Sequence, residues 1–376
     1  MQLSKHWVSP VEHLQRVQPD YPVLYFCPAV LLDTVRDFIK GFPGLVTYAV
    51  KANPHSAVLA NINAAGITAF DVASPAEMAL ILEQAPQAKL HYNNPVRSTA
   101  EVETARQMHI TSWSVDEFSE LEKLRDLPKG TEIAVRLALP LEGAAYHFGA
   151  KFGAPPALAA RLLAEVDARG YSPSLCFHPG TQCSDPAIWS HYIATCADVA
   201  REAAVRIARL NVGGGFPSHR GGQAPDLVRI FKAIDKEIKR SFPIDRPQLL
   251  CEPGRALVSE AFTLACRIKA FRDNASVFLN DGIYGALAEA RDMEPLTRLK
   301  VVSPDGQPRL GVPVARQCFG PTCDSIDCLP KPIALPRDTL EGDYVLFSGI
   351  GAYSMSLATR FNGYGLSDPQ TVTVLQ

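Results

Sequence analysis

A lysine at the end of an apolar run is the residue whose position most directly suggests chemistry. Lys51 follows Leu45-Val46-Thr47-Tyr48-Ala49-Val50 and precedes Ala52-Asn53-Pro54. The run has the length and β-branched content of a buried strand, and Asn-Pro is a breaker, so Lys51 is expected where a strand meets its loop. An amine held there among apolar neighbours has a lowered pKa and can attack a carbonyl carbon. A lysine that only extends its ammonium to solvent is the alternative.

A glycine triplet and a charged turn follow two later strand candidates. Gly213-Gly214-Gly215 comes directly after the apolar segment 209–212, and glycines let backbone N–H groups converge on an anion such as a phosphate. Glu252 and Arg255 belong to the segment Glu-Pro-Gly-Arg at the end of another apolar segment. A plain loop and a charged turn are the alternative interpretations of these two segments.

Short apolar segments alternate with helical patterns over the first two thirds of the chain. The strand candidates are residues 45–50, 67–71, 89–92, 110–115, 132–137, 174–178, 209–212 and 248–252. This alternation predicts an α/β fold, a (β/α)₈ barrel of the TIM type, in which the C-terminal ends of the strands carry the chemistry. An open, doubly wound sheet is the structural alternative.

The pattern of apolar segments in the sequence changes after Gly254. Proline and glycine separate short β-like segments at residues 256–258, 262–268, 276–279, 309–312, 343–347 and 371–375. This pattern predicts a β-rich module. We therefore expect a barrel over residues 22–260 and a C-terminal β-rich domain formed by residues 1–21 and 261–376.

Composition excludes several classes of protein. The 376 residues are 47% hydrophobic with a formal net charge of -2, which is typical of a globular protein and gives no sign of a nucleic-acid partner. The nine cysteines include no Cys-x-x-Cys pair, so neither a zinc site nor a disulfide framework is expected. No apolar run reaches the roughly 18 residues of a membrane span, and the segment Met1 to Trp7 has no apolar core. We expect a cytoplasmic protein without a membrane partner.

The segment Tyr48-Ala49-Val50-Lys51-Ala52-Asn53-Pro54 resembles the cofactor-lysine segment of the fold-type III pyridoxal-phosphate (PLP) enzymes. This family includes ornithine and diaminopimelate decarboxylases and alanine racemase, and its lysine bonds covalently to the cofactor. The resemblance implies an alanine racemase-like barrel that binds pyridoxal 5'-phosphate through Lys51. It also implies that Gly213-Gly214-Gly215 is the phosphate loop, that Glu252 partners the ring nitrogen and that Arg255 is a phosphate ligand.

Further segments resemble the family's cofactor site in chain order. His178-Pro179-Gly180-Thr181-Gln182 is similar to a segment in which a histidine stacks on the cofactor ring and a following hydroxyl reaches the phosphate. Pro179 and Thr181 stand where Val and Ser are common in the family, and the proline removes one N–H. The other positions that match the lining of the cofactor site are Asp71, Arg136, the loop Lys151-Phe152-Gly153 and the late tyrosine Tyr353.

Two segments in the second half of the chain indicate the substrate. The stretch from Gly320 to Asp327 resembles the loop that ornithine decarboxylases donate across a dimer interface. In that loop a cysteine, here Cys323, controls proton transfer at Cα of the substrate. An aspartate, here Asp324, binds the distal amine of the substrate. Asn280-Asp281-Gly282-Ile283-Tyr284-Gly285 resembles the segment that supplies a second carboxylate, here Asp281, with Tyr284 beside it. Two carboxylates favour a substrate that ends in an ammonium group.

The resemblance spans about residues 22 to 365 and implies a homodimeric amino acid decarboxylase with shared active sites. We expect a basic amino acid as substrate, most specifically L-ornithine, giving putrescine as in polyamine biosynthesis. Lysine, a D-amino acid or meso-diaminopimelate are alternative substrates, because one methylene changes binding by only about 1 to 3 kcal/mol. A racemase, a non-catalytic PLP carrier and a regulatory decoy of a decarboxylase are the remaining alternatives.

Overall fold

The computed structural model describes residues 6–140, 151–273, 275–293 and 297–375. The chain forms two compact units. The barrel unit contains residues 35–217 and 225–254, and the β-rich unit contains residues up to 34, residues 218–224 and residues from 255 onward.

The barrel unit is an eight-stranded parallel barrel whose first strand is interrupted once. Strands β2 (Leu45–Val46) and β3 (Tyr48–Ala49) flank Thr47, whose N–H and hydroxyl donate to the carbonyl oxygen of Cys251 at 2.9 and 3.0 Å. Strand β2 pairs with β10 and β3 pairs with β4, which closes the ring. The other strands are β4 (Ala69–Val72), β5 (Lys89–Tyr92), β6 (Ser112–Val115), β7 (Glu132–Leu137), β8 (Ser172–Phe177), β9 (Arg209–Asn211) and β10 (Gln248–Cys251). The predicted barrel and its eight strands are confirmed.

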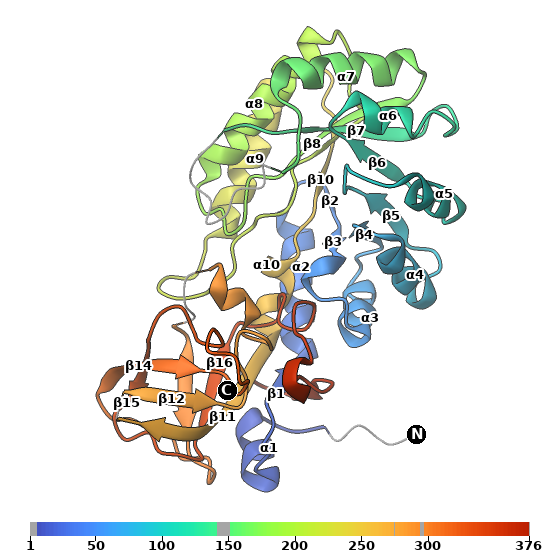
Figure 1. Cartoon of the computed structure of the whole chain (residues 1–376). Helices are drawn as coiled ribbons and strands as arrows, with labels where there is room; N and C mark the ends of the chain where they lie inside the picture. The colour runs from blue at the N-terminus through green and yellow to red at the C-terminus, as the bar shows by residue number, and fades with distance from the viewer. Residues whose placement is uncertain (1–5, 141–150, 274, 294–296, 376) are drawn as a thin grey trace. The chain divides into compact units, whose positions relative to one another are not determined.

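Helices connect successive strands and lie along the outside of them (Figure 1). They are α2 (Pro28–Gly41), α3 (Ser56–Ala64), α4 (Pro75–Gln84), α5 (Thr99–Gln107), α6 (Phe118–Glu122), α7 (Pro156–Ala168), α8 (Pro186–Glu202) and α9 (Leu227–Ser241). Ser74 and Asp185 precede prolines at the first turns of α4 and α8, and their side chains cap these helices because each accepts a first-turn N–H. The segment Ser114-Val115-Asp116-Glu117 predicts a capping box at Ser114, but this prediction is wrong, because Ser114 lies in β6 and Glu117 caps α6.

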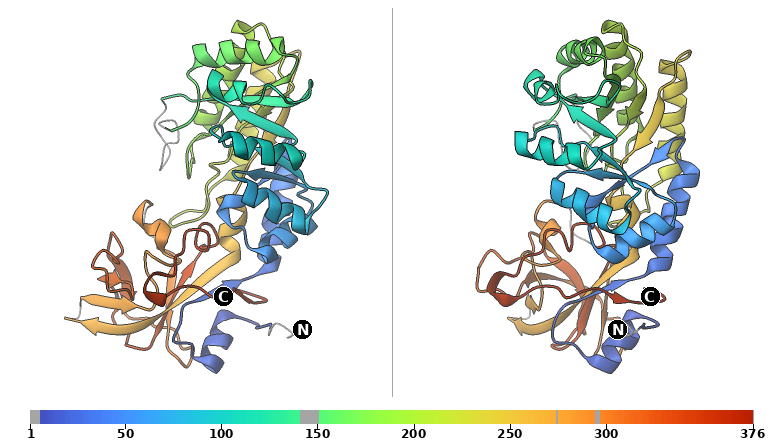
Figure 2. Two further views of the ribbon diagram at one scale, coloured as in Figure 1. Left: turned by 45° about the vertical axis from the view of Figure 1, so that its right-hand side comes forward. Right: turned by 90° about the vertical axis from the view of Figure 1, so that its right-hand side faces the viewer.

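The β-rich unit is built on a sheet in the order β13-β16-β11-β12-β14-β15, with β1 paired to β11 and β17 paired to β1. Figure 2 shows the strands after residue 260 in gold to red. Its strands are β1 (Val23–Phe26), β11 (Phe262–Arg272), β12 (Ser276–Leu279), β13 (Leu299–Val302), β14 (Pro313–Phe319), β15 (Ile333–Pro336), β16 (Tyr344–Ser348) and β17 (Gln370–Thr371). The shorter elements are α1 (Pro10–Val17), α10 (Arg255–Val258) and the 3-10 turns η2 (Ser259–Ala261), η3 (Ala288–Arg291) and η4 (Phe361–Gly363).

Two strand predictions in this unit are wrong. Residues 256–258 belong to helix α10, because three apolar residues fit a buried helical turn as well as a strand. Residues 309–312 precede strand β14, which begins at Pro313, and proline is tolerated as the first residue of a strand.

The two units divide the chain differently from the expected boundaries at residues 22 and 260. Strand β1 pairs antiparallel with β11 and parallel with β17, so the N-terminal segment packs with the β-rich unit. The barrel unit keeps its own closed sheet without this strand. Among the residues that the structure describes, no helix is long and apolar enough to cross a bilayer.

Candidate cofactor and substrate site

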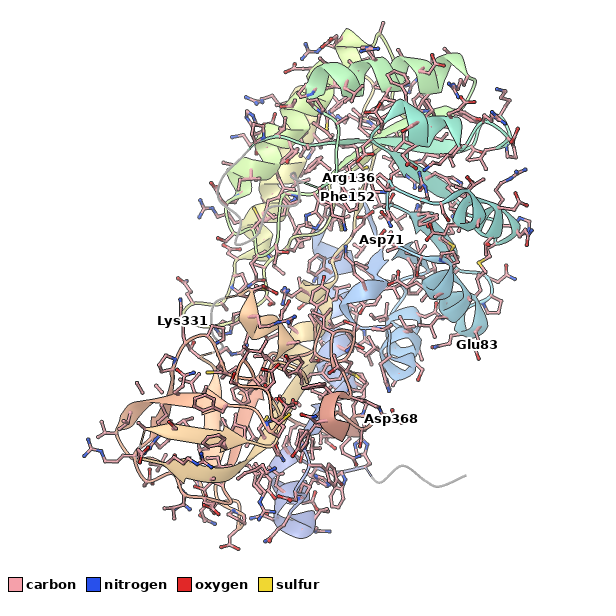
Figure 3. The ribbon with its side chains drawn as sticks, viewed as in Figure 1. Asp71, Glu83, Arg136, Phe152, Lys331 and Asp368 are labelled. Atoms are coloured by element: carbon pink, nitrogen blue, oxygen red, sulfur yellow. The ribbon has the colours of Figure 1, made fainter. Side chains whose placement is uncertain are left out.

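A cavity of about 190 Å³ lies in the barrel unit. The polar side chains that line it include those of Lys51, Asp71, Asn93, Arg136, His178 and Glu252. These residues lie at or just after the C-terminal ends of β3, β4, β5, β7, β8 and β10. Figure 3 shows Asp71, Arg136 and Phe152 gathered within the barrel unit. Because parallel strands end on one rim, the fold brings together residues that are far apart in the sequence.

Lys51 lies two residues after strand β3, in the single 3-10 turn η1 (Val50–Ala52). Its side chain is exposed and lines the cavity. The charge of its ammonium acts on the carboxylates of Asp71 and Glu252. The surroundings of this amine are therefore carboxylates rather than the apolar neighbours that the sequence suggested.

Glu252 and Asp71 are two carboxylates on the same cavity. Burial and the negative charge of Asp71 raise the pKa of Glu252, while a hydrogen bond from Asn211 and the charge of Lys51 lower it. Burial also raises the pKa of Asp71, and the charges of Lys51 and Arg136 act in the opposite direction. The cations of Lys51 and Arg136 therefore act on both carboxylates in one partly enclosed site.

Two asparagines that sequence reasoning did not single out bind Glu252. The Nδ2 groups of Asn93 and Asn211 both donate to Oε1 of Glu252. Asn211 is the last residue of β9, and Asn93 directly follows β5. The available signal was a polar residue at the end of a barrel strand, the same signal that identified Lys51.

His178 follows β8 and is neutral in the barrel unit. Burial and the charges of Lys51 and Arg136 hold the pKa of His178 well below its usual value. The backbone N–H of Gly180 donates to its Nδ1 at 3.1 Å, so the proton of the neutral ring belongs on Nε2. Thr181, the predicted hydroxyl, is half-buried in the same loop.

The glycine loop passes too close to neighbouring backbone for side chains. A Cβ on Gly214 would lie 2.6 Å from the carbonyl oxygen of Glu252 and 3.3 Å from Nε2 of His178. Gly213 and Gly215 have φ values of 71° and 80°, which favour glycine. The backbone N–H of Gly213 donates to Oδ1 of Asn211 at 2.9 Å. The loop therefore lies directly beside His178 and Glu252.

The Lys-Phe-Gly loop lies against strand β7. The guanidinium of Arg136 lies 5.2 Å from the ring centroid of Phe152, and the ammonium of Lys151 lies 4.9 Å from the same centroid. The N–H of Ala154 donates to the carbonyl oxygen of Arg136 at 2.8 Å, which fixes the loop in register. Arg136, Lys151 and Phe152 all line the cavity.

The donor and acceptor set of this cavity fits PLP. An amine for the cofactor aldehyde, a carboxylate for its ring nitrogen and a neutral imidazole for its ring face are present together in the barrel unit. Oδ1 of Asn94, which also lines the cavity, is buried and has no hydrogen-bond partner in the described part of the chain. A buried acceptor of this kind is normally satisfied by a hydrogen-bond donor from a bound molecule or from water.

Arg255 and Tyr353 lie together in the β-rich unit. The guanidinium of Arg255 is 5.0 Å from the ring centroid of Tyr353. It also makes two hydrogen bonds to Glu289, one of them 2.6 Å between Nη1 and Oε2. Nη1 of Arg220 lies 3.1 Å from the same Oε2. Sequence reasoning missed Glu289 and Arg220, whose partners are distant in the chain.

Tyr284 and Asp324 are brought together in the β-rich unit. The hydroxyl of Tyr284 donates to Oδ2 of Asp324 at 2.6 Å, and this bond lowers the pKa of Asp324. The neighbouring Cys323 is exposed, and its backbone N–H donates to Oδ1 of Asn362 at 3.1 Å. The loop therefore presents an ionised carboxylate beside an exposed thiol.

Asp281 lies in a different environment. It is 3% exposed, and its Oδ2 accepts the backbone N–H of Ala286 at 2.9 Å. Burial raises the pKa of Asp281 to about 7, against the lowering effect of backbone hydrogen bonds. Asp327, which sequence reasoning did not single out, joins the two loops by accepting from the N–H of Ile283 at 3.0 Å and the hydroxyl of Thr322 at 2.8 Å.

Comparisons with known proteins agree with this site. One curated relative is the decarboxylase flvG of Aspergillus flavus, which is 31% identical over 86% of this chain and 79% of that protein. Another is the lysine/ornithine decarboxylase of Selenomonas ruminantium, which is 31% identical over 86% of this chain and 82% of that protein. The mouse ornithine decarboxylase is 29% identical over 87% of this chain and 75% of that protein.

Solved structures with the same fold include the lysine/ornithine decarboxylase of Vibrio vulnificus in complex with cadaverine, with a TM-score of 0.81 and 27% identity over 94% of this chain and 95% of that one. The SrLDC mutant in complex with PLP has a TM-score of 0.85 and 28% identity over 96% and 94%. The family model for the pyridoxal binding domain of pyridoxal-dependent decarboxylases matches residues 31–259. The chain therefore belongs to the fold-type III PLP-dependent decarboxylases, close to ornithine decarboxylase.

Proposed function

We propose that this chain decarboxylates L-ornithine to putrescine, within the decarboxylation of basic amino acids that its family performs. The choice of L-ornithine as the substrate rests on the pair formed by Tyr284 and Asp324 beside Cys323. Asp324 is ionised, and a carboxylate presented on an exposed loop suits a substrate that ends in an ammonium group. The relatives named as ornithine decarboxylases support the same choice.

In this proposal Lys51 holds PLP through its ε-nitrogen. When bound, the cofactor supplies an electron sink for the pair of electrons left behind as CO₂ departs. Glu252 holds a proton at the ring nitrogen, and a cation at that position in turn favours the ionised carboxylate. The neutral imidazole of His178 offers a flat face for the ring.

The remaining proposed cofactor residues bind the phosphate or orient the ring. Backbone N–H groups of the glycine loop, the hydroxyl of Thr181 and the guanidinium of Arg255 are donors suited to a phosphate. Tyr353 supports Arg255 through the contact of its ring with the guanidinium. Asp71 and Arg136 set the charge of the cavity that Lys51 lines.

Cys323 is proposed to deliver the proton to Cα after CO₂ leaves, with Asp324, Asp281 and Tyr284 binding the distal ammonium. The barrel unit would supply the cofactor site and the β-rich unit would complete it in a homodimer. Exposed apolar side chains in the β-rich unit support a partner of this kind, because such residues favour burial in an interface. They include Ile326, Leu357, Phe361 and Tyr364.

Mixing two inactive variants tests whether active sites are shared. Lys51→Ala and Cys323→Ala homodimers should each lose activity. If each site takes Lys51 from one subunit and Cys323 from the other, an equal mixture should regain about a quarter of wild-type activity after subunit exchange. A mixture that remains inactive although exchange is demonstrated by mass spectrometry contradicts the shared site.

We also propose a cytoplasmic location. The cysteines that the structure describes are free thiols, as in proteins kept in a reducing compartment. Fractionation of the native host with an antibody to the chain tests this, and recovery in an oxidising compartment contradicts it.

The substrate is tested by measuring CO₂ release from L-ornithine, L-lysine, L-arginine, D-ornithine and meso-diaminopimelate. We expect the highest kcat/KM for L-ornithine, with L-lysine lower by roughly 10 to 200 fold, the range that one methylene can give. Lysine is the second candidate because the Selenomonas relative is named as acting on both. A higher kcat/KM for any other substrate overturns the choice of ornithine, and bound PLP without turnover overturns the decarboxylase proposal.

A further inference from the structure

The carboxylate of Glu252 is held by two side-chain amides from two other barrel strands. Nδ2 of Asn93, just after β5, and Nδ2 of Asn211, at the end of β9, both donate to the same oxygen, Oε1. The three side chains therefore form a connected group across the rim of the barrel unit. Neither asparagine has a role in the proposed function above.

The orientation of the Asn211 amide is fixed by a second hydrogen bond. Its Oδ1 accepts the backbone N–H of Gly213 at 2.9 Å, so the other end of the amide must present its N–H groups. Asn211 is 6% exposed, which leaves little room for another rotamer. One side chain thus links the glycine loop to Glu252.

Asn93 lies between two carboxylates. Its amide donates to Glu252, and a hydrogen bond from Asn93 also lowers the pKa of Asp71 against the raising effect of burial. An amide with two N–H groups can serve both acids, which would otherwise repel each other when ionised.

The loop that carries Asn93 is itself anchored. Arg97 is 2% exposed and its guanidinium lies over the rings of Tyr92 and Trp113, 5.1 and 5.5 Å from their centroids. The same guanidinium donates to the carbonyl oxygen of Tyr92 at 3.4 Å. Asn93 is therefore placed by a rigid support rather than by a free loop.

We propose that Asn93 and Asn211 are positioning residues that make Glu252 less basic and hold it in one orientation, so that its carboxylate leaves the proton on the pyridine nitrogen of PLP. This inference rests on the proposed role of Glu252. Without the two N–H donors the carboxylate would become more basic and would take up the proton itself, which would weaken the ring as an electron sink.

The test uses holoenzyme loaded with PLP that carries ¹⁵N at the ring nitrogen. The ¹⁵N chemical shift reports directly whether that nitrogen is protonated. It is measured for wild type, Asn93→Ala, Asn211→Ala, the double variant, Glu252→Gln and the control Asn63→Asp, which changes an exposed asparagine on α3. The dissociation constant for PLP is measured in parallel, so that loss of cofactor is not mistaken for loss of the proton.

We expect the single variants to move the ¹⁵N shift toward the deprotonated value and the double variant to move it further. We also expect kcat to fall on the order of ten-fold for each amide removed. Asn63→Asp should change none of these quantities. If Glu252→Gln moves the shift but the asparagine variants do not, this inference is wrong while the role of Glu252 stands. If Glu252→Gln leaves the shift unchanged, the proposed role of Glu252 fails as well.

Discussion

Arg255 and Glu289 form a bidentate ion pair in the interior of the β-rich unit, where each residue is only 8% exposed. Arg220 shares the same carboxylate, with its Nη1 3.1 Å from Oε2 of Glu289. Three distant segments of the chain thus meet at one acid. The pair fixes a guanidinium that lies on the ring of Tyr353, a residue with the unusual φ of 62°.

Replacing Glu289 should destabilise the β-rich unit. Glu289→Gln leaves two buried arginines without their counter-charge, and breaking a buried pair in this way costs about 3 to 5 kcal/mol. Urea unfolding measures the effect as a lower midpoint. The matched control is Glu260→Gln, which removes a more exposed partner of Arg298 and should cost about 0 to 1 kcal/mol. Equal losses for both variants would contradict the buried pair as a stabilising feature.

His91 should make the protein sensitive to mild acid. It is 1% exposed, its Nδ1 lies 2.7 Å from the hydroxyl of Ser112, and burial together with the charges of Arg209 and Lys89 lowers its pKa from 6.5 to about 3. The unfolded chain therefore binds a proton first, so stability present above pH 6.5 is lost as the pH falls from 6.5 toward 3. At pH 5 the loss amounts to about 2 kcal/mol.

The variant that checks this is His91→Gln, whose amide can still bind the hydroxyl of Ser112. Its free energy of unfolding should fall less steeply than that of wild type between pH 6.5 and 4. His191→Gln, at an exposed position on α8, serves as the control and should keep the wild-type slope. A slope for His91→Gln that equals that of wild type would show that His91 is not the group responsible.

Gly214→Ala should weaken the binding of PLP. The added methyl group would lie 2.6 Å from the carbonyl oxygen of Glu252, so the glycine loop or the backbone at Glu252 must shift. We expect the dissociation constant for PLP to rise by about ten-fold or more, from a clash that costs about 1 to 3 kcal/mol. Gly130→Ala, where none of the described residues has an atom within 4 Å of the added carbon, should leave PLP binding unchanged. Tight binding by Gly214→Ala would exclude this loop from the cofactor site.

Asp324→Asn should impair recognition of the distal ammonium specifically. The substitution keeps the shape of the side chain and removes its charge, so kcat/KM for L-ornithine should fall roughly 10 to 100 fold. The value for L-norvaline, which lacks the distal amine, should change little. Ser325→Ala, an exposed neighbour in the same loop, is the control. Equal losses for ornithine and norvaline would assign Asp324 a structural role instead.

The barrel and the place of Lys51 could be predicted because both follow from local patterns. Apolar runs and breakers mark each strand, and the parallel fold then puts every strand end on one rim. The same logic identifies Glu252 without any knowledge of its contacts. The roles of the two asparagines could not be predicted in this way, because they depend on hydrogen bonds to Glu252. Asn93, for example, is 159 residues from Glu252 in the sequence.

The β-rich unit was less predictable. The sequence did not predict strands β13 and β15, and it predicted a strand before the start of β14. The strands of this unit contain or adjoin prolines, which resemble turn signals in the sequence. Glu289 lies in the short turn η3, where an acid resembles an ordinary surface residue. Its burial between two arginines is a property of the folded chain alone.

The central claim is that the ε-nitrogen of Lys51 is the atom that bonds to PLP. It is tested most directly by borohydride reduction of the holoenzyme, followed by peptide mass spectrometry to locate the pyridoxyl group. Lys40→Ala, which changes an exposed lysine on α2, should be labelled as wild type is. We predict the label on Lys51 and its loss in Lys51→Ala. A label on Lys151, which lines the same cavity, or undiminished labelling of Lys51→Ala would contradict the account.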